Sequence, residues 1–379
     1  MTGFSFIAPQ CTLMGRGCCD QVAGEIAALG RRVLLLRGTH ARADRLASEL
    51  TGLGCDVTTI RTQGEPTLTQ LDMLLITARA ATPQVVVGLG GGAVMDMAKA
   101  LAALAPASSN PLDHLEIVGR GQPLTVPPLP FVAIPTTAGT GAEATKNAVI
   151  GVEAQSRKVS LRDLRMMATL AVVDPALTDN CPRSVTLASG LDAITQVIEP
   201  YLSCRANPVT DALCRDSIWA GMAALADLMQ GENPVARDTM ARTSHFSGLA
   251  LANSGLGAVH GLAGVIGGVT GAAHGAICGR LLPPVLAANR AAMQRAGLDA
   301  SRFDDVDRWI GAALGQCGLA EEMLERFADT HGLPRLAALG VTPDIYDNLV
   351  TEAAQSSSMK GNPVPLTARD LHAVLERAA

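Results

Sequence analysis

The sequence has few aromatic residues, little lysine and no cluster of positive charge. Aromatic side chains make up 3% of the 379 residues, lysine occurs at only four positions, and the formal net charge is -5. Proteins that bind nucleic acid usually present a basic patch or a row of aromatic side chains on which bases stack. We therefore expect no nucleic-acid partner.

The C-x-x-C motif and the pattern of a signal peptide are also missing. The nine cysteines contain no C-x-x-C pair, and an odd set of this kind is typical of reduced, mostly buried thiols. The first ten residues, MTGFSFIAPQ, lack the basic flank and apolar core of a signal peptide. Both features favour a cytoplasmic location.

Charged residues are absent from position 246 to position 279, a length that would cross a bilayer. Small residues recur there at Gly-x-x-x-Gly spacing, as in packed membrane helices. However, the stretch contains Asn253, His260 and His274, is rich in glycine, and has no Trp or Tyr to lie at a membrane interface. We expect buried core helices and no membrane partner.

Apolar runs of strand type alternate with helical patterns in the first half of the chain. The predicted strands cover 31–38, 55–60, 84–92 and 130–137, and the predicted helices between them cover 41–54, 67–80 and 93–104. This alternation predicts an α/β domain with a doubly wound, Rossmann-like parallel sheet at 1–181. From 182 to 379 the sequence has helical spacing of Ala, Leu, Gly and Met, which predicts an all-α domain.

Two glycine-containing loops follow predicted strands. In VVVGLGGGAVMDMAKA, Gly90, Gly91 and Gly92 separate a strand from a helix, so backbone N–H groups could approach a pyrophosphate. In IPTTAGTGAEAT, Thr136, Thr137 and Thr140 offer hydroxyl groups. Either loop alone could be an ordinary turn. Because open α/β sheets bind ligands at strand ends, the two together favour a nucleotide.

Potential metal ligands occur in the second half. His260 and His274 lie in the uncharged segment, while Asp192 and Gln196, four residues apart, share one face of a predicted helix. Two imidazoles, a carboxylate and an amide oxygen could hold Fe(II) or Zn(II). Alternatively, the histidines could be hydrogen-bonded core residues, and Asp192 could have a capping role.

These motifs resemble the iron-containing (group III) alcohol dehydrogenase family. The resemblance covers nearly the whole chain and includes GLGGGAVMDMAKA, PTTAGTGAEAT, SGLDAITQVIEPYLS, HGLAGVIGG, HGAICGRLLP and GNPVPLT. It implies a dehydroquinate synthase-like architecture, a divalent metal between the two domains, a nicotinamide cofactor, a small alcohol or aldehyde substrate, and usually a homodimer.

The resemblance also assigns metal ligands and two departures from the family pattern. Asp192, Gln196, His260 and His274 fall on the ligand positions, with Asp192, His260 and His274 as the catalytic set. Gln196 stands where the family normally has histidine, so we expect looser metal binding, a changed metal preference, or an ion held by only three groups and water. Gly264 stands where many members have a histidine near the reacting alcohol, and glycine cannot relay a proton.

The resemblance implies that the cofactor binds to residues of the first domain. The expected cofactor-binding residues are Gly38, Thr39, Gly90, Gly91, Gly92, Ala93, Asp96, Thr136, Thr137, Thr140, Lys158 and Thr178. The family often has an acid at position 38, which would repel a 2′-phosphate. Because Gly38 removes that charge and Arg37 and Arg42 could attract a phosphate, we favour NADP over NAD.

Three alternative functions share this fold. The first is a metal-free reductase or a nucleotide-binding protein without dehydrogenase activity, which the residues Gln196 and Gly264 would explain. The second is a maleylacetate reductase-like enzyme, although those relatives resemble a version without the aspartate found here. The third is a lyase of the dehydroquinate synthase type, which needs several basic side chains around its substrate, and the region from 185 to 280 supplies few.

Overall fold

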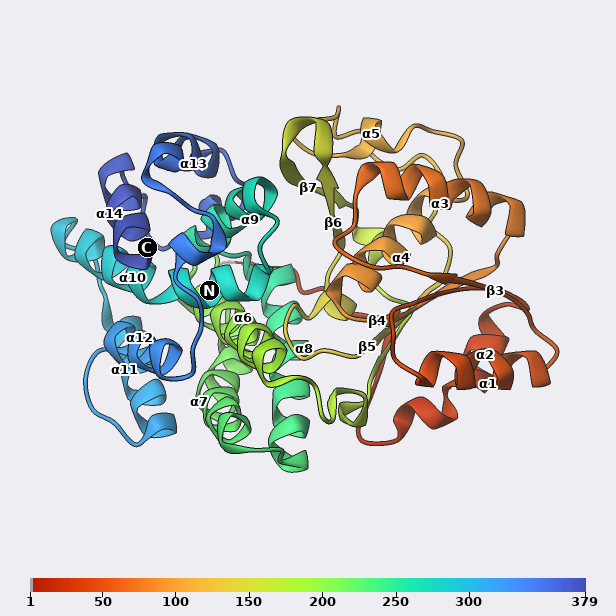
Figure 1. Ribbon diagram of the computed structural model, residues 1–379, viewed down its shortest axis with the longest axis horizontal. Coiled ribbons are helices and arrows are strands. Elements are labelled where there is room, and N and C mark those ends of the chain that lie inside the picture. The colour runs from red at the N-terminus through yellow and green to blue at the C-terminus, as the bar shows by residue number, and fades with distance from the viewer. Residues whose placement is uncertain (1–2) are drawn as a thin grey trace. The chain divides into compact units, whose positions relative to one another are not determined.

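The computed structural model describes residues 3–379, which divide into two compact units (Figure 1). The sheet unit consists of Ala8–Thr137 and Gly141–Asp179, and the helical unit contains Asn180–Ala379, Ala138–Thr140 and the segment that ends at Ile7. The sheet unit therefore ends at Asp179, two residues before the predicted domain boundary at 181. The short segment Ala138–Thr140 differs from the predicted division, because it belongs to the helical unit.

Six parallel strands form the main sheet, in the order β1-β8-β5-β4-β2-β3. Their bounds are β1 Cys11–Met14, β2 Arg32–Arg37, β3 Asp56–Arg61, β4 Val85–Gly90, β5 Phe131–Pro135 and β8 Leu170–Val173. The four predicted strands correspond to β2, β3, β4 and β5, which confirms the predicted parallel sheet. The chain reverses its direction of winding between β2 and β4, so the ends of these strands form the position where such sheets bind ligands.

Helices cover both faces of this sheet (Figure 1). They are α1 Val22–Leu29, α2 Arg42–Gly52, α3 Leu68–Ala81 and α4 Gly92–Leu104. Leu34 and Leu36 of β2 pack with residues of α3 and α4, whereas Val33 and Leu35 pack with residues of α1 and α2. Burial on both faces explains why the strands read as continuous apolar runs.

A two-stranded antiparallel hairpin, β6 Asn147–Val152 and β7 Arg157–Arg162, accompanies the main sheet and was not predicted. Lys99 of α4 anchors the chain that leads into it. The buried Lys99 Nζ donates to Ala142 O at 2.7 Å, Thr145 Oγ1 at 2.9 Å and Asn147 O at 2.8 Å. Burial lowers the pKa of Lys99 to about 8, while Asp96 and Glu143 act in the opposite direction.

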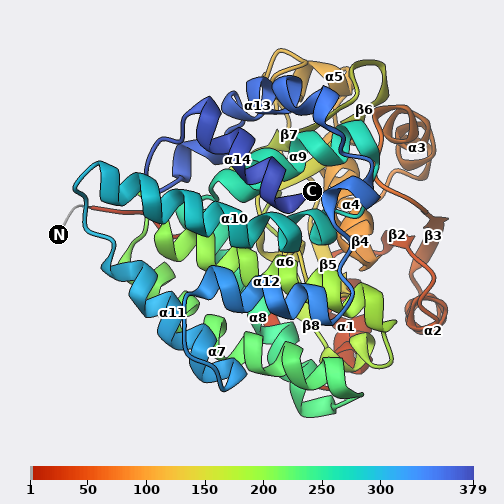
Figure 2. The same cartoon turned by 60° about the vertical axis from the view of Figure 1, so that its left-hand side comes forward.

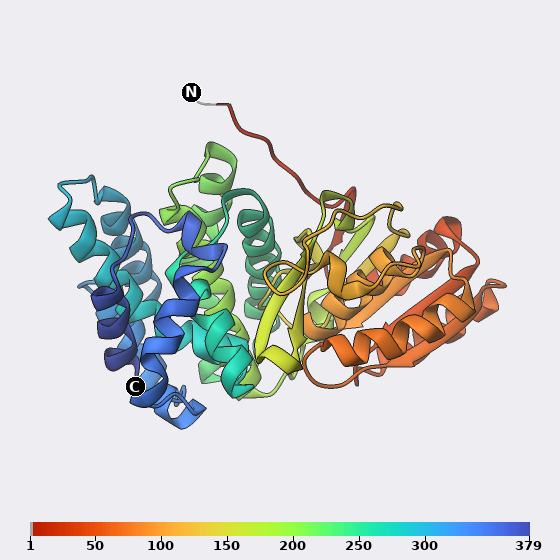
Figure 3. The same ribbon diagram turned by 90° about the horizontal axis from the view of Figure 1, so that it is seen from above.

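The helical unit contains only helices, turns and loops in the green-to-blue part of the chain (Figure 2, Figure 3). Its α-helices are α6 Arg183–Leu202, α7 Pro208–Gln230, α8 Pro234–Ser254, α9 Ala258–Thr270, α10 His274–Arg295, α11 Ser301–Leu314, α12 Ala320–Thr330, α13 Tyr346–Ala354 and α14 Ala368–Ala378. Asn-Pro pairs begin α7 and α8, because the asparagine side chain accepts from the first backbone N–H groups and proline suits the first turn.

The uncharged segment lies in α8, α9 and α10, and most of its residues are buried. Within residues 3–379, no single helix is long and apolar enough for a membrane span. The pair α8 and α9 reaches that length and hydropathy only together, with a bend of 103° at the break. All nine cysteines are free thiols: Cys11, Cys18, Cys19, Cys55, Cys181, Cys204, Cys214, Cys278 and Cys317.

Candidate metal centre

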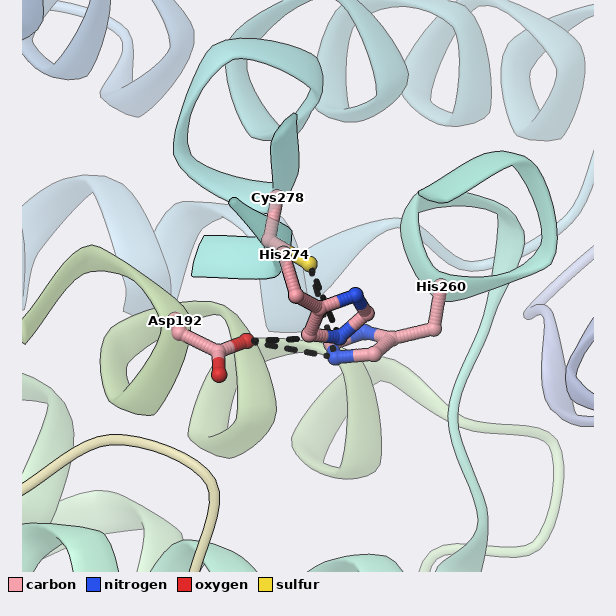
Figure 4. Close-up of side chains that lie close together, drawn as sticks. All are labelled: Asp192, His260, His274 and Cys278. Carbon is pink, nitrogen blue, oxygen red and sulfur yellow. Dashed lines mark hydrogen bonds and ion pairs between the residues drawn. The ribbon is translucent and has the colours of Figure 1, made fainter. Parts of the chain in front are cut away.

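Three of the predicted metal ligands converge within the helical unit (Figure 4). Asp192 lies in the middle of α6, His260 in the first turn of α9, and His274 at the start of α10. Asp192 Oδ1 is 3.4 Å from His260 Nε2 and 3.9 Å from His274 Nε2. Asp192 is 1% exposed, yet its Oδ1 has no hydrogen-bond partner among the described residues. Such a buried oxygen, facing two imidazoles, fits a cation.

Cys278 is a fourth member of this cluster that the sequence analysis did not identify. It lies one helical turn after His274 on α10 and is fully buried. Its Sγ is 3.5 Å from His274 Nε2 and 3.7 Å from His260 Nε2. The four ligand atoms all lie within 4.8 Å of one another, which satisfies the geometric requirement for a shared ion.

Glycines allow α10 to approach α6 closely enough to form the cluster. A Cβ at Gly275 would overlap Ala188 O and lie 3.2 Å from Asp192 Cβ, and one at Gly279 would lie 2.8 Å from Leu191 Cβ. These glycines are four residues apart and lie on either side of Cys278 in the sequence. The close approach therefore places Cys278 and His274 beside Asp192.

We expect Gly275→Ala to destabilise the protein by about 1–3 kcal/mol, because the added methyl forces α10 away from α6. The same displacement should weaken metal binding. Gly264→Ala is the matched control, since no atom lies within 4 Å of its Cβ position and alanine favours a helix. Chemical denaturation and metal titration of both variants test this, and equal stabilities would contradict the packing argument.

Glu199 fixes the orientation of the His260 ring. It lies on α6 and its Oε2 accepts a hydrogen bond from His260 Nδ1 at 2.6 Å, which leaves Nε2 directed toward Asp192 and Cys278. Its Oε1 accepts from the backbone N–H of Val259 at 2.7 Å. Asn362 Oδ1 accepts from Ala258 N at 3.0 Å, so both side chains also satisfy the first N–H groups of α9. Carboxylate–histidine pairs of this kind orient metal ligands in many proteins.

The charges in the cluster shift several pKa values. Burial acts to raise the pKa of Asp192, but the His260 and His274 imidazoles outweigh it and hold that pKa below its usual value. Burial acts to lower the pKa of His260, whereas Cys278, Glu199 and Asp192 raise it well above its usual value. Burial raises the pKa of the Cys278 thiol to about 12. A bound cation would therefore have to displace protons.

Gln196 and Gly264, the two departures from the family pattern, have different surroundings. Gln196 is buried on α6, and its Nε2 donates to Gly139 O at 3.1 Å. Its amide nitrogen thus binds a loop carbonyl, and its role as a metal ligand remains a prediction. A Cβ at Gly264 would meet no atom within 4 Å, so a side chain lost at this position leaves open space.

The predicted nucleotide loops lie at the ends of β2, β4 and β5, and apart from Ala138–Thr140 they belong to the sheet unit. Gly38 N donates to Leu89 O at 3.0 Å, and a Cβ at Gly38 would lie 3.9 Å from Gly90 Cα. Thr136 N donates to Gly90 O at 2.9 Å, and a Cβ at Gly91 would lie 3.5 Å from the Thr137 side chain. The structure therefore brings these two glycine-containing loops together. Gly92 and Ala93 begin α4, whose N-terminal N–H groups suit a phosphate.

Three other predicted cofactor residues, Asp96, Lys158 and Thr178, have partners within the protein. Asp96 Oδ2 accepts from Val149 N at 3.1 Å, and burial raises the pKa of Asp96 to about 6. Lys158 Nζ lies 3.0 Å from Glu65 Oε2, and Thr178 Oγ1 donates to Pro175 O at 2.8 Å. Thr39 is exposed beside Gly38. Thr140 belongs to the helical unit with Gly139, and is the one predicted cofactor residue that the structure assigns to it.

The two arginines expected to attract a 2′-phosphate differ in their contacts. Arg37 lies at the end of β2, where its Nε donates to Gly38 O at 3.2 Å and its guanidinium pairs with Asp44. Arg42 is buried, and its Nη2 donates to Cys19 O at 2.6 Å and to Glu49 Oε2 at 2.9 Å. Arg42 therefore holds the chain around Cys19 and Glu49 together. Of the two arginines, Arg37 is the better candidate to attract a 2′-phosphate.

Comparison with known proteins places both halves of the chain in one family. Residues 9–175 match the model for iron-containing alcohol dehydrogenase, and residues 186–379 match the C-terminal model of the same family. Long-chain-alcohol dehydrogenase 1 of Geobacillus thermodenitrificans is 31% identical over an alignment of 387 positions, which covers 98% of this chain and 96% of that protein. The NAD-dependent methanol dehydrogenase of Bacillus methanolicus is 29% identical over 99% of each chain. The crystal structure of a 1,3-propanediol oxidoreductase superposes with a TM-score of 0.90 at 26% identity, and the match covers 100% of both chains.

Proposed function

The chain belongs to the iron-containing alcohol dehydrogenase family, and from this premise we propose that it interconverts a small aliphatic alcohol and its aldehyde with NADP as the preferred cofactor. The observation that carries the proposal is the convergence of Asp192 Oδ1, His260 Nε2 and His274 Nε2 on one point. A carboxylate and two imidazoles form a donor set that suits a catalytic Fe(II) or Zn(II).

The residues of the helical unit would hold the metal, and those of the sheet unit would hold the cofactor. A bound divalent cation supplies Lewis-acid polarisation of the substrate oxygen, and the nicotinamide accepts or donates hydride. Asp192 contributes negative charge, and Glu199 keeps the proton of His260 on Nδ1, so that Nε2 can donate its lone pair. The first N–H groups of α4, with Gly90 and Gly91, would receive the pyrophosphate.

The substrate proposal rests on relatives and on Gly264. The three relatives described above are named for long-chain alcohols, methanol and 1,3-propanediol, and these three are alcohols without charged groups. The open space at Gly264 favours an alcohol larger than methanol. Since glycine has no proton-accepting atom, we propose that the substrate hydroxyl proton passes to water.

Turnover of purified protein tests this function. The experiment compares NADP and NAD with a panel of linear alcohols and aldehydes, after loading with Zn(II) or Fe(II) and again after treatment with a chelator. We expect nicotinamide absorbance to change only with metal-loaded protein. Activity that survives complete metal removal would favour the metal-free reductase, and no turnover with any compound would contradict the dehydrogenase proposal.

The cofactor preference leads to a specific substitution, Gly38→Asp. The Cβ of residue 38 has room, because its nearest neighbour is Val94 Cγ2 at 3.6 Å. A carboxylate there should repel a 2′-phosphate by about 1–2 kcal/mol, which corresponds to a roughly 5- to 30-fold fall in kcat/KM for NADP relative to NAD. Steady-state kinetics with both cofactors measure this ratio, and Gly38→Ala controls for the added Cβ. An unchanged ratio would place the 2′-phosphate elsewhere.

We also propose a cytoplasmic homodimer. The nine free thiols support a reducing compartment, and the family resemblance supports the dimer. Light scattering on the purified protein measures its mass, and a monomer would contradict the second proposal.

A further inference from the structure

We infer that Cys278 binds the metal as a fourth protein ligand and that the resulting site prefers Zn(II). The inference rests on the proposed function, because it assumes a divalent cation held by Asp192, His260 and His274. It adds a residue and a metal preference that neither the family resemblance nor the sequence motifs assign.

Four of the six distances between the donor atoms are close to those of a tetrahedron. Donors at Zn(II) bond lengths of about 2.0–2.3 Å lie roughly 3.3–3.8 Å apart in tetrahedral geometry. The Cys278 Sγ lies 3.5 Å and 3.7 Å from the two histidine Nε2 atoms, and Asp192 Oδ1 lies 3.4 Å and 3.9 Å from the same atoms. The thiol is therefore a ligand by position as well as by chemistry.

The buried carboxylate supplies an independent reason to place a cation here. Asp192 Oδ1 has no hydrogen-bond partner in the described part of the chain, although the residue is 1% exposed. Buried carboxylate oxygens are normally paired or bound to metal. The Nε2 atoms of His260 and His274 face this oxygen, and all three atoms could bind the same cation (Figure 4).

Gln196, the other candidate for the fourth ligand, is less well suited. Its amide nitrogen donates to Gly139 O, whereas the Cys278 sulfur faces both metal-binding imidazoles. An amide oxygen suits hard cations such as Mg²⁺ or Ca²⁺, while a thiolate selects softer ions, and a carboxylate–His₂–Cys set suits Zn(II). Zn(II) can also become five-coordinate, so four protein ligands do not exclude a substrate.

A buried cysteine is often only a small apolar residue, so the experiment must detect the sulfur–metal bond itself. Cobalt(II) replaces Zn(II) in such sites and gives a near-ultraviolet charge-transfer band only when a thiolate binds it. We expect the full-length protein to bind one Co(II) with this band. Cys278→Ala should still bind Co(II) but lose the band. It should also bind Zn(II) at least about 100-fold more weakly, which exceeds the usual effect of replacing a residue that only hydrogen-bonds to a metal ligand.

Two further variants make the result specific. Cys214→Ala removes another fully buried thiol of the helical unit and should keep both the band and the affinity. Gln196→Ala tests the rival ligand and should keep the band. X-ray absorption of the Zn(II) form should find one sulfur at about 2.3 Å in the unmodified protein and none in Cys278→Ala.

The outcomes separate this inference from the proposed function. Stoichiometric metal without the charge-transfer band, together with unchanged affinity in Cys278→Ala, would overturn the inference and leave the dehydrogenase proposal intact. Failure of the unmodified protein to bind any divalent metal would overturn both. A larger loss of affinity in Gln196→Ala than in Cys278→Ala would assign the fourth position to the amide.

Discussion

Replacement of Asp192 by asparagine is expected to lower kcat/KM by roughly 10⁴-fold, because the metal loses its one carboxylate ligand. Lewis-acid stabilisation of the reacting oxygen is worth several kcal/mol, and each 1.36 kcal/mol corresponds to a factor of about ten in rate. Asparagine has nearly the same shape as aspartate, so the buried position in α6 should remain filled. Steady-state kinetics and metal analysis after dialysis measure the two losses.

The thermal stability of the same variant separates loss of metal from loss of fold. Saturating Zn(II) should raise the melting temperature of the unmodified protein by several degrees, since a ligand that binds only the native state stabilises it. This increase should vanish in Asp192→Asn, while the metal-free proteins melt at similar temperatures. Asp227→Asn changes an exposed carboxylate of α7 and should behave like the unmodified protein. A metal-dependent increase that persisted in Asp192→Asn would remove Asp192 from the site.

The sheet was predictable from sequence because its pattern is local. Residues Val33 to Leu36 form a continuous apolar run, which is typical of a strand buried on both faces, and the glycines 90–92 mark the end of β4. The hairpin β6 and β7 escaped prediction. Its strands are six residues long and alternate buried with partly exposed positions, and β7 includes charged residues typical of a surface loop.

The candidate metal centre was predictable only in part. His260, His274 and Asp192 are recognisable as polar residues in apolar segments, and the resemblance linked them. Cys278 follows His274 by one turn, a spacing that puts both on one helix face and could have identified it.

Two residues with predicted ligand roles, Gln196 and Arg42, make contacts with distant segments of the chain. Gln196 donates to Gly139, which is 57 positions away, and Arg42 donates to Cys19, which is 23 positions away. Both residues were assigned to ligands from their neighbours in sequence. Local spacing cannot show that a side chain has a partner elsewhere in the fold, because that partner is placed by tertiary packing.

Replacement of Glu199 by glutamine is expected to weaken metal binding by up to about 100-fold, although Glu199 is a positioning residue. The carboxylate accepts from both His260 Nδ1 and Val259 N. A glutamine has one acceptor and one donor end, so one of these two N–H groups must face an NH₂ group. If the amide turns its NH₂ toward His260, the ring proton moves to Nε2, the atom that should bind the metal. If it turns the other way, the first turn of α9 loses a hydrogen bond to a charged group, worth about 1.5–3 kcal/mol.

Both alternatives lead to measurable and different changes in Glu199→Gln. A shifted tautomer should weaken Zn(II) binding, measured by competition with a chromophoric chelator, and should change the imidazole ¹⁵N NMR signals of His260. A lost helix contact should lower the free energy of unfolding of the metal-free protein. Glu321→Gln is the matched control, because it alters another buried carboxylate of this unit that pairs with Arg290, and only its stability should fall. Unchanged metal affinity and unchanged His260 signals in Glu199→Gln would show that the orientation of the ring does not depend on the carboxylate. The packing of α9 against its neighbours would then be sufficient to direct Nε2 toward Asp192.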